Sequence, residues 1–162
     1  MAQKLSERRL AVWGRGKLGG VLLRAYLAQG LFSAKRVTAT VKPGEKAAAL
    51  AKELGVGVTT DNRKAVHGAD IVVLGEAASG ERSVERDCAG VACRDAGGFG
   101  RCVVPTTYIE QHAGDEVPVV RAMPSTCSRV GSGMSGICRG THAKAEHLEA
   151  ARAMFDGWGE PL

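Results

Sequence analysis

The sequence predicts an α/β fold with a doubly wound, mostly parallel sheet in a single domain. Short apolar runs of strand length alternate with amphipathic helical patterns, in the order β-α-β-α-β-α-β up to residue 74. The run Ile71–Leu74 is apolar throughout, as expected for a strand that is buried on both faces. The chain of 162 residues is long enough for one domain with its own core, and its 44% hydrophobic and 24% charged residues are typical of a globular protein.

Helical periodicity and glycines define the elements of the first half. Apolar residues from Leu18 to Ala25 repeat at helical spacing, and Gly30 is expected to end that helix. A second helical pattern is expected to stop at Gly55. In chain order, the predicted elements are a strand at 10–13, a helix at 17–29, a strand at 36–41, a helix at 47–54, a strand at 56–58, a short helix capped by Asp61 and running to Val66, and a strand at 71–74.

The second half of the chain is less regular. Residues 75–100 show no clean period, and a helix over 79–87 is only weakly indicated. The remaining predicted elements are a strand at 102–104, a helix at 106–112, strands at 117–121 and 132–139, and a final helix with Leu148, Ala151, Met154, Phe155 and Trp158 on one face.

A glycine loop joins the first predicted strand to the first predicted helix. It reads Gly14-Arg15-Gly16-Lys17-Leu18-Gly19, which is the G-x-G-x-x-G spacing of Rossmann dinucleotide-binding units. Gly14 permits the tight turn, Gly16 lets the backbone approach a pyrophosphate, and Gly19 lets the helix pack on the strand. The chain has 22 glycines, so the spacing alone arises readily by chance, but the preceding strand and the following helix strengthen it. Backbone N–H groups from Gly14 to Gly19 are therefore expected to face the phosphates.

Basic residues near this loop bear on the choice of cofactor. Arg15 and Lys17 either add positive charge beside the pyrophosphate or are solvated surface side chains, and both interpretations stay open. A domain that prefers NAD places an acidic residue about 20 residues beyond the loop. Val41 holds that position here, between Thr40 and Lys42. Because Lys42 can pair with a 2′-phosphate, the sequence predicts NADP rather than NAD, although a lysine that only solvates a turn is the alternative.

A second motif lies at Val120–Thr126, which reads Val-Arg-Ala-Met-Pro-Ser-Thr and is followed by Gly131 and Gly133. Together with the glycine loop, this motif resembles the pyrroline-5-carboxylate reductase family, where the segment usually reads Arg-Ala-Met-Pro-Asn-Thr-Pro. Residues 45–63 and 140–143 also follow the family pattern, so the resemblance covers about residues 8–74 and 117–160. It implies a Rossmann domain and reduction of a cyclic imine to proline with NAD(P)H.

The resemblance also suggests where the cofactor would lie. It places Asn62 near the adenosine and Met123, Pro124 and Ser125 beneath the nicotinamide. On the residues alone, Asn62 is equally well explained as a helix-start residue beside Asp61, and the other three as a strand end with a turn.

Departures from the family pattern bear on activity. The family has Ala-Val-Lys-Pro after its fourth strand, whereas this chain has Gly75-Glu76-Ala77-Ala78, and Pro105-Thr106-Thr107 replaces an Ala-Ala-Gly turn. The family also continues into a helical dimerisation domain, which is not found in residues 1–162. The sequence therefore predicts the cofactor domain of a truncated or diverged relative, and it identifies no catalytic residue. An NADP-dependent imine reductase and a non-catalytic nucleotide-binding or interaction domain both remain open.

Other classes of function find little support. The net charge of +5 comes without a dense basic run or a nucleic-acid-binding motif, and the histidines and five cysteines show no metal-ligand spacing. Cys127, where the family has proline, is explained better as an inert thiol than as a reactive one. No apolar stretch approaches the ~20 residues of a membrane-spanning helix. We therefore expect a cytoplasmic protein without metal, membrane or nucleic-acid partners, and leave homo-oligomer formation and a small imine substrate open.

Overall fold

The centre of the protein is a five-stranded sheet in the order β3-β2-β1-β4-β5, in which every pair is parallel. The structure is a computed structural model and describes residues 5–13, 17–41, 47–74, 98–99, 105–114, 116–124 and 135–155. The strands are β1 (Leu10–Trp13), β2 (Val37–Thr40), β3 (Gly57–Thr59), β4 (Ile71–Leu74) and β5 (Gly98–Phe99). The predicted α/β, doubly wound, mostly parallel fold is confirmed, with Ala11 beside Val72 in the register of β1 and β4.

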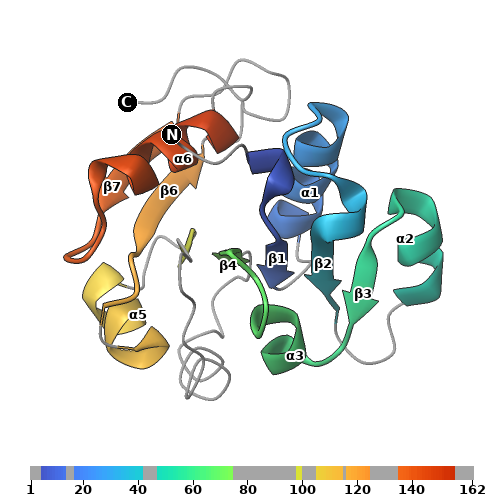
Figure 1. The fold of residues 1–162 in the computed structure, drawn as a ribbon, viewed down its shortest axis with the longest axis horizontal. Coiled ribbons are helices and arrows are strands. Elements are labelled where there is room, and N and C mark those ends of the chain that lie inside the picture. The colour runs from blue at the N-terminus through green and yellow to red at the C-terminus, as the bar shows by residue number, and fades with distance from the viewer. Residues whose placement is uncertain are drawn as a thin grey trace.

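Helices cover both faces of the sheet (Figure 1). Alternate residues of β1 point to opposite faces. Leu10 and Val12 join an apolar cluster that includes residues of α1 and α6, whereas Ala11 and Trp13 join a second cluster with residues of α3 and α5. The helices are α1 (Lys17–Ala28), α2 (Ala47–Leu54), α3 (Asn62–Val66), α5 (Thr106–Ala113) and α6 (Ala145–Phe155), with short 3-10 turns η1 (Leu5–Glu7) and η2 (Ala34–Arg36).

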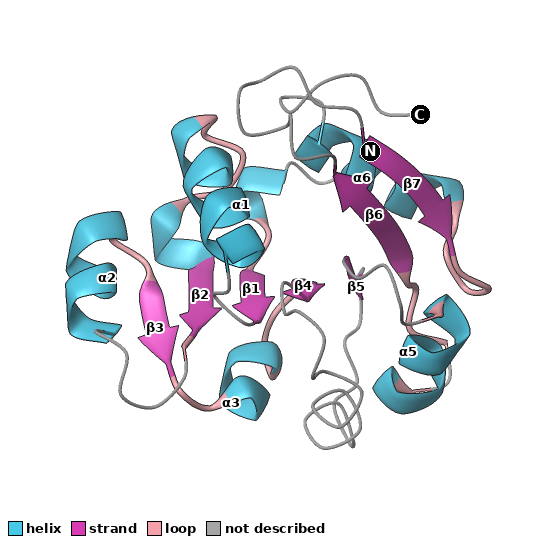
Figure 2. Ribbon diagram, turned by 180° about the vertical axis from the view of Figure 1, so that it is seen from behind, coloured by secondary structure: helices cyan, strands magenta, loops and turns pink. Residues whose placement is uncertain are grey.

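A separate antiparallel pair completes the described fold, and Figure 2 shows it beyond β5, beside α6. It consists of β6 (Val120–Pro124) and β7 (Ser135–Arg139), with Val120 opposite Arg139. The sequence places a strand at 117–121, but the ladder begins three residues later. Pro118 has no N–H to donate to a ladder, which explains the delayed start.

The helix ends follow the sequence signals closely. Gly30 and Gly55, which follow α1 and α2, both have φ of +66°, a left-handed conformation that glycine adopts without strain. Asp61 caps α3, because its Oδ1 accepts a hydrogen bond from the Lys64 N–H at 3.1 Å. The predicted elements at 79–87 and 102–104, the first part of 132–139 and the position of Trp158 lie outside the described residues.

An ion pair joins the starts of β1 and β4. Asp70 Oδ2 accepts a hydrogen bond from the Arg9 backbone N–H at 2.7 Å, and Oδ1 lies 3.1 Å from Arg9 Nη2. The side-chain hydrogen bond from Arg9 is the main cause that lowers the pKa of Asp70. This contact is present while Asp70 is ionised and is lost as the pH falls through its lowered pKa, so acid weakens it.

The core contains one polar atom whose removal we expect to stabilise the protein. Tyr26 is fully buried on α1 beside Phe32, and among the described residues its hydroxyl has no hydrogen-bond partner. An unsatisfied buried hydroxyl costs about 1–3 kcal/mol. We therefore expect Tyr26→Phe to raise the free energy of unfolding by about 1 kcal/mol in urea titrations, and a loss of stability of that size would contradict this. Tyr108→Phe, at a partly exposed tyrosine, serves as the control.

Candidate functional site: the carboxyl edge of the parallel sheet

The carboxyl ends of the parallel strands meet at one edge of the sheet. Trp13, Thr40, Thr59 and Leu74 end β1, β2, β3 and β4 there. The strand order reverses between β1 and β4, because β2 follows β1 on one side and β4 lies on the other. In open α/β sheets, ligands bind in the crevice at such a reversal. This edge is therefore the first candidate for a functional site.

The glycine loop leaves β1 at this edge. Gly14, Arg15 and Gly16 lie outside the described residues, and α1 begins directly afterwards at Lys17 and Leu18. The first N–H groups of a helix have no partner within the helix, so the start of this 12-residue helix offers donors to an anion. Gly19 is buried, as expected for a glycine that lets α1 pack closely on the sheet.

The end of β2 carries no acidic side chain. Thr40 is 2% exposed and Val41 is 7% exposed, so both lie within the edge of the core. The Val41 N–H donates to the Thr59 carbonyl oxygen at 3.1 Å, which fixes this segment beside β3. Lys42 follows outside the described residues. Val41 thus occupies, as a buried apolar residue, the position where an acid would bind ribose hydroxyls.

The other predicted cofactor residues fall into two groups. Asn62 is half-buried at the first position of α3, which follows β3 and so starts near the same edge. Met123 and Pro124 end β6, where the Met123 side chain is 49% exposed, and Ser125 lies outside the described residues. Among the described residues β6 contacts β5 but pairs only with β7. Gly19, Thr40 and Asn62 thus belong to segments that start or end at this edge, whereas Met123 and Pro124 belong to the second sheet.

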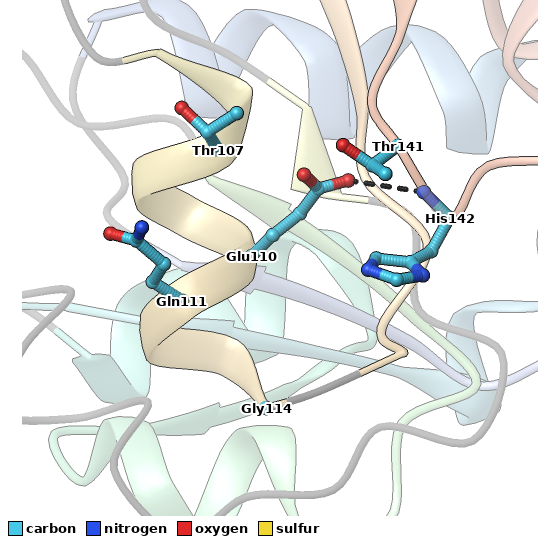
Figure 3. Close-up of a pocket in the computed structure, with 6 residues that line it drawn as sticks. All are labelled: Thr107, Glu110, Gln111, Gly114, Thr141 and His142. Carbon is cyan, nitrogen blue, oxygen red and sulfur yellow. Dashed lines mark hydrogen bonds between the residues drawn. The ribbon is translucent and has the colours of Figure 1, made fainter.

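A polar pocket that the sequence did not reveal lies between α5 and the turn before α6. It has a volume of about 210 Å³ and is lined by Thr107, Glu110, Gln111, Gly114, Thr141 and His142. Figure 3 shows the Glu110 side chain directed from α5 towards Thr141 and His142. The Glu110 carboxylate accepts a hydrogen bond from the His142 backbone N–H at 3.3 Å, and only 7% of Glu110 is exposed.

A glycine makes room for this carboxylate. The Gly140 N–H donates to the Val119 carbonyl oxygen at 2.8 Å, which holds Gly140 beside the start of β6. A Cβ atom at Gly140 would overlap Glu110 Oε1 and would lie 3.0 Å from the Val119 oxygen. Glu110 and Gly140 are 30 positions apart in sequence, and no local pattern links them.

The described residues give two further observations on function. In that part of the chain, no group of three or more His, Cys, Asp or Glu side chains is arranged to hold a metal ion. None of the described helices has the length and apolar character needed to cross a membrane.

Comparison with known proteins identifies relatives for nearly the whole chain. Residues 9–79 match the family described as NADP oxidoreductase, coenzyme F420-dependent. A pyrroline-5-carboxylate reductase of Mycobacterium leprae is 31% identical over 163 residues, which covers 97% of this chain and 55% of the relative. The sequence resemblance to the pyrroline-5-carboxylate reductases is thus confirmed.

Solved structures agree at the level of the fold. A pyrroline-5-carboxylate reductase from Coxiella burnetii has a TM-score of 0.81 at 23% identity, over 96% of this chain and 58% of that one. A Plasmodium falciparum pyrroline carboxylate reductase, crystallised with NADP bound, has a TM-score of 0.75 at 15% identity, over 98% of this chain and 58% of that one. The chain spans a little over half the length of the curated relatives that it matches.

Proposed function

We propose, from the premise that this chain is a relative of the pyrroline-5-carboxylate reductases, that it forms the NADP(H)-binding part of an oxidoreductase. The observation that carries the proposal is the reversal of strand order between β1 and β4, with the glycine loop leaving β1 at that point. The residues present fit a dinucleotide there, because α1 starts within the glycine motif, at Lys17, and Gly19, the last glycine of the motif, is buried.

Each candidate residue has a proposed role in holding the cofactor. Backbone N–H groups from Gly14 to Gly19 bind the pyrophosphate, with Arg15 and Lys17 adding positive charge beside it. Thr40 and Lys42 lie at the end of β2, where Lys42 pairs with the 2′-phosphate. The buried Val41 offers no carboxylate to ribose hydroxyls, which favours NADP over NAD.

The reaction that we propose is reduction of the C=N bond of a small cyclic imine, as in pyrroline-5-carboxylate reduction. NADPH, when bound, supplies the hydride. The task of this chain is then to orient the cofactor, with Asn62 on the adenosine side and Met123, Pro124 and Ser125 on the nicotinamide side. We assign no side chain as an acid or base.

One sequence observation favours a second function, a non-catalytic nucleotide-binding domain. Glu76 stands just after β4 in a segment where the related reductases have Ala-Val-Lys-Pro. That segment lines the nicotinamide side in the family pattern, so its loss would impair hydride transfer while the glycine loop is kept. If the domain is non-catalytic, NADPH binds but is not oxidised when pyrroline-5-carboxylate is added. If it is a reductase, NADPH and pyrroline-5-carboxylate are both consumed.

Calorimetric titration with NADPH and NADH tests the proposed cofactor. We expect NADPH to bind more tightly than NADH, and Lys42→Glu to weaken NADPH binding by roughly 1–3 kcal/mol because a charge-assisted hydrogen bond is lost. Lys35→Glu is the matched control, since Lys35 is exposed in η2 at the opposite end of β2. Equal affinity for the two nucleotides, or equal losses in the two variants, would contradict the assignment.

A further inference from the structure

The pocket between α5 and the turn 140–142 has the character of a binding site. Glu110 lines it and is almost fully buried, whereas Thr107, Gln111, Thr141 and His142, which also line it, are exposed. The exposed residues mean that a solute can enter the pocket from the surface of the protein. The volume of about 210 Å³ is several times the ~30 Å³ that one water occupies in the liquid, so the pocket admits a molecule of several heavy atoms.

The Glu110 carboxylate has spare acceptor capacity. In the part of the chain that the structure describes, it accepts one hydrogen bond, from the His142 backbone N–H. An ionised carboxylate has two oxygens with about four acceptor sites. A buried carboxylate with few donors is costly, and a cation with several N–H donors lowers that cost.

Neighbouring side chains add acceptors rather than positive charge. Thr141 contributes a hydroxyl oxygen, and His142 contributes its imidazole ring to the same lining (Figure 3). Among the described residues that line the pocket there is no Lys or Arg. Its lining therefore suits a compact cation and does not suit an anion such as a phosphate.

The pocket is separate from the proposed cofactor residues of β6. Gly140 pairs with Val119 at the start of β6, whereas Met123 and Pro124 lie at its end. At a rise of about 3.4 Å per residue, the five residues of β6 separate these two ends by about 14 Å. A ligand in the pocket would therefore not contact Met123 or Pro124, and the pocket can be tested separately from the proposed NADP(H) site.

We propose that this pocket binds a small primary ammonium compound. The ammonium group has three N–H donors. The Glu110 carboxylate supplies the opposite charge and accepts one of them, and the Thr141 hydroxyl and the His142 imidazole accept the others. The aliphatic part of the ligand lies along the surface of α5 between Thr107 and Gln111.

Two small probes of the same size test this proposal on the unaltered chain. Backbone N–H resonances of Gln111, Gly114, Thr141 and His142 are followed by NMR during titration with n-propylammonium chloride, with 1-propanol as the neutral probe and sodium chloride at matched ionic strength. We expect saturable shifts with n-propylammonium chloride and none with 1-propanol or sodium chloride. Absence of saturation, or equal shifts with 1-propanol, would overturn the proposal.

Variants then assign the binding to the buried carboxylate. Glu110→Gln keeps an oxygen for the His142 N–H but removes the charge, so we expect at least a tenfold loss of n-propylammonium affinity without loss of the fold. Glu146→Gln makes the same change at an exposed residue of α6 and should bind as the unaltered chain does. Equal affinity in Glu110→Gln would show that Glu110 only anchors the turn, and would refute the site even if the probe binds.

Discussion

Replacement of Gly19 by leucine is expected to weaken NADPH binding by up to about a hundredfold. Gly19 is the last glycine of the loop motif and is buried in the first turn of α1. A leucine side chain adds four carbon atoms at this buried position, so we expect it to push α1 away from β1. Overpacking of this kind costs about 1–3 kcal/mol. If the helix position that binds NADPH bears this cost, ~2.8 kcal/mol corresponds to a hundredfold loss of affinity.

The neighbouring glycine provides the control for this variant. Gly20 is partly exposed on the same helix, so Gly20→Leu makes the same chemical change where the side chain can reach solvent. Leucine also has a higher helix propensity than glycine by about 1 kcal/mol, and this gain applies to both variants. Calorimetry should therefore find NADPH affinity reduced in Gly19→Leu and close to normal in Gly20→Leu. The reverse order would mean that α1 does not hold the phosphates.

Replacement of Met154 by alanine is expected to cost about 2–5 kcal/mol of folding free energy. Met154 is fully buried on α6, in the cluster that also contains Leu10, Val12 and Ala122. This cluster joins the parallel sheet to β6. A cavity at Met154 therefore weakens the attachment of the second sheet as well as the core. Urea titration of the purified chain measures the loss.

An exposed methionine gives the matched comparison. Met123 is 49% exposed at the end of β6, so Met123→Ala removes the same atoms where about half of the residue's surface already lies in water. We expect its free energy of unfolding to change by less than about 0.5 kcal/mol. Similar losses in the two variants would show that α6 does not form part of the main core.

The parts of the fold that sequence predicts well are those with local physical causes. Continuous apolar residues at Ile71–Leu74 predict a strand buried on both faces, and the structure places it in the centre of the sheet. Glycines after α1 and α2 and the Asp61 cap end or begin helices through their own backbone and side-chain chemistry. β5 escaped prediction because Gly98–Phe99 is too short to show a period, and its strand character comes from pairing with β4.

The two candidate sites also differ in whether a local sequence pattern reveals them. The glycine loop is a contiguous pattern, so the carboxyl edge could be proposed from sequence alone. The pocket lined by Glu110 could not be proposed from sequence. The surroundings of the Glu110 carboxylate depend on Gly140 and on the turn that carries His142, about 30 residues away. Glu110 follows the buried Ile109 on α5, and by pattern alone a glutamate in a short helix reads as a solvated residue.

Locating the bound nucleotide decides whether the carboxyl edge of the parallel sheet holds NADP(H). Backbone N–H resonances of the isotopically labelled chain can be followed by NMR as NADPH is added. We expect saturable shifts at Gly19, Thr40, Val41 and Asn62, which lie on segments that meet that edge. Shifts confined to the pocket between Thr107 and His142, or no saturable shifts, would contradict an NADP(H) site at this edge.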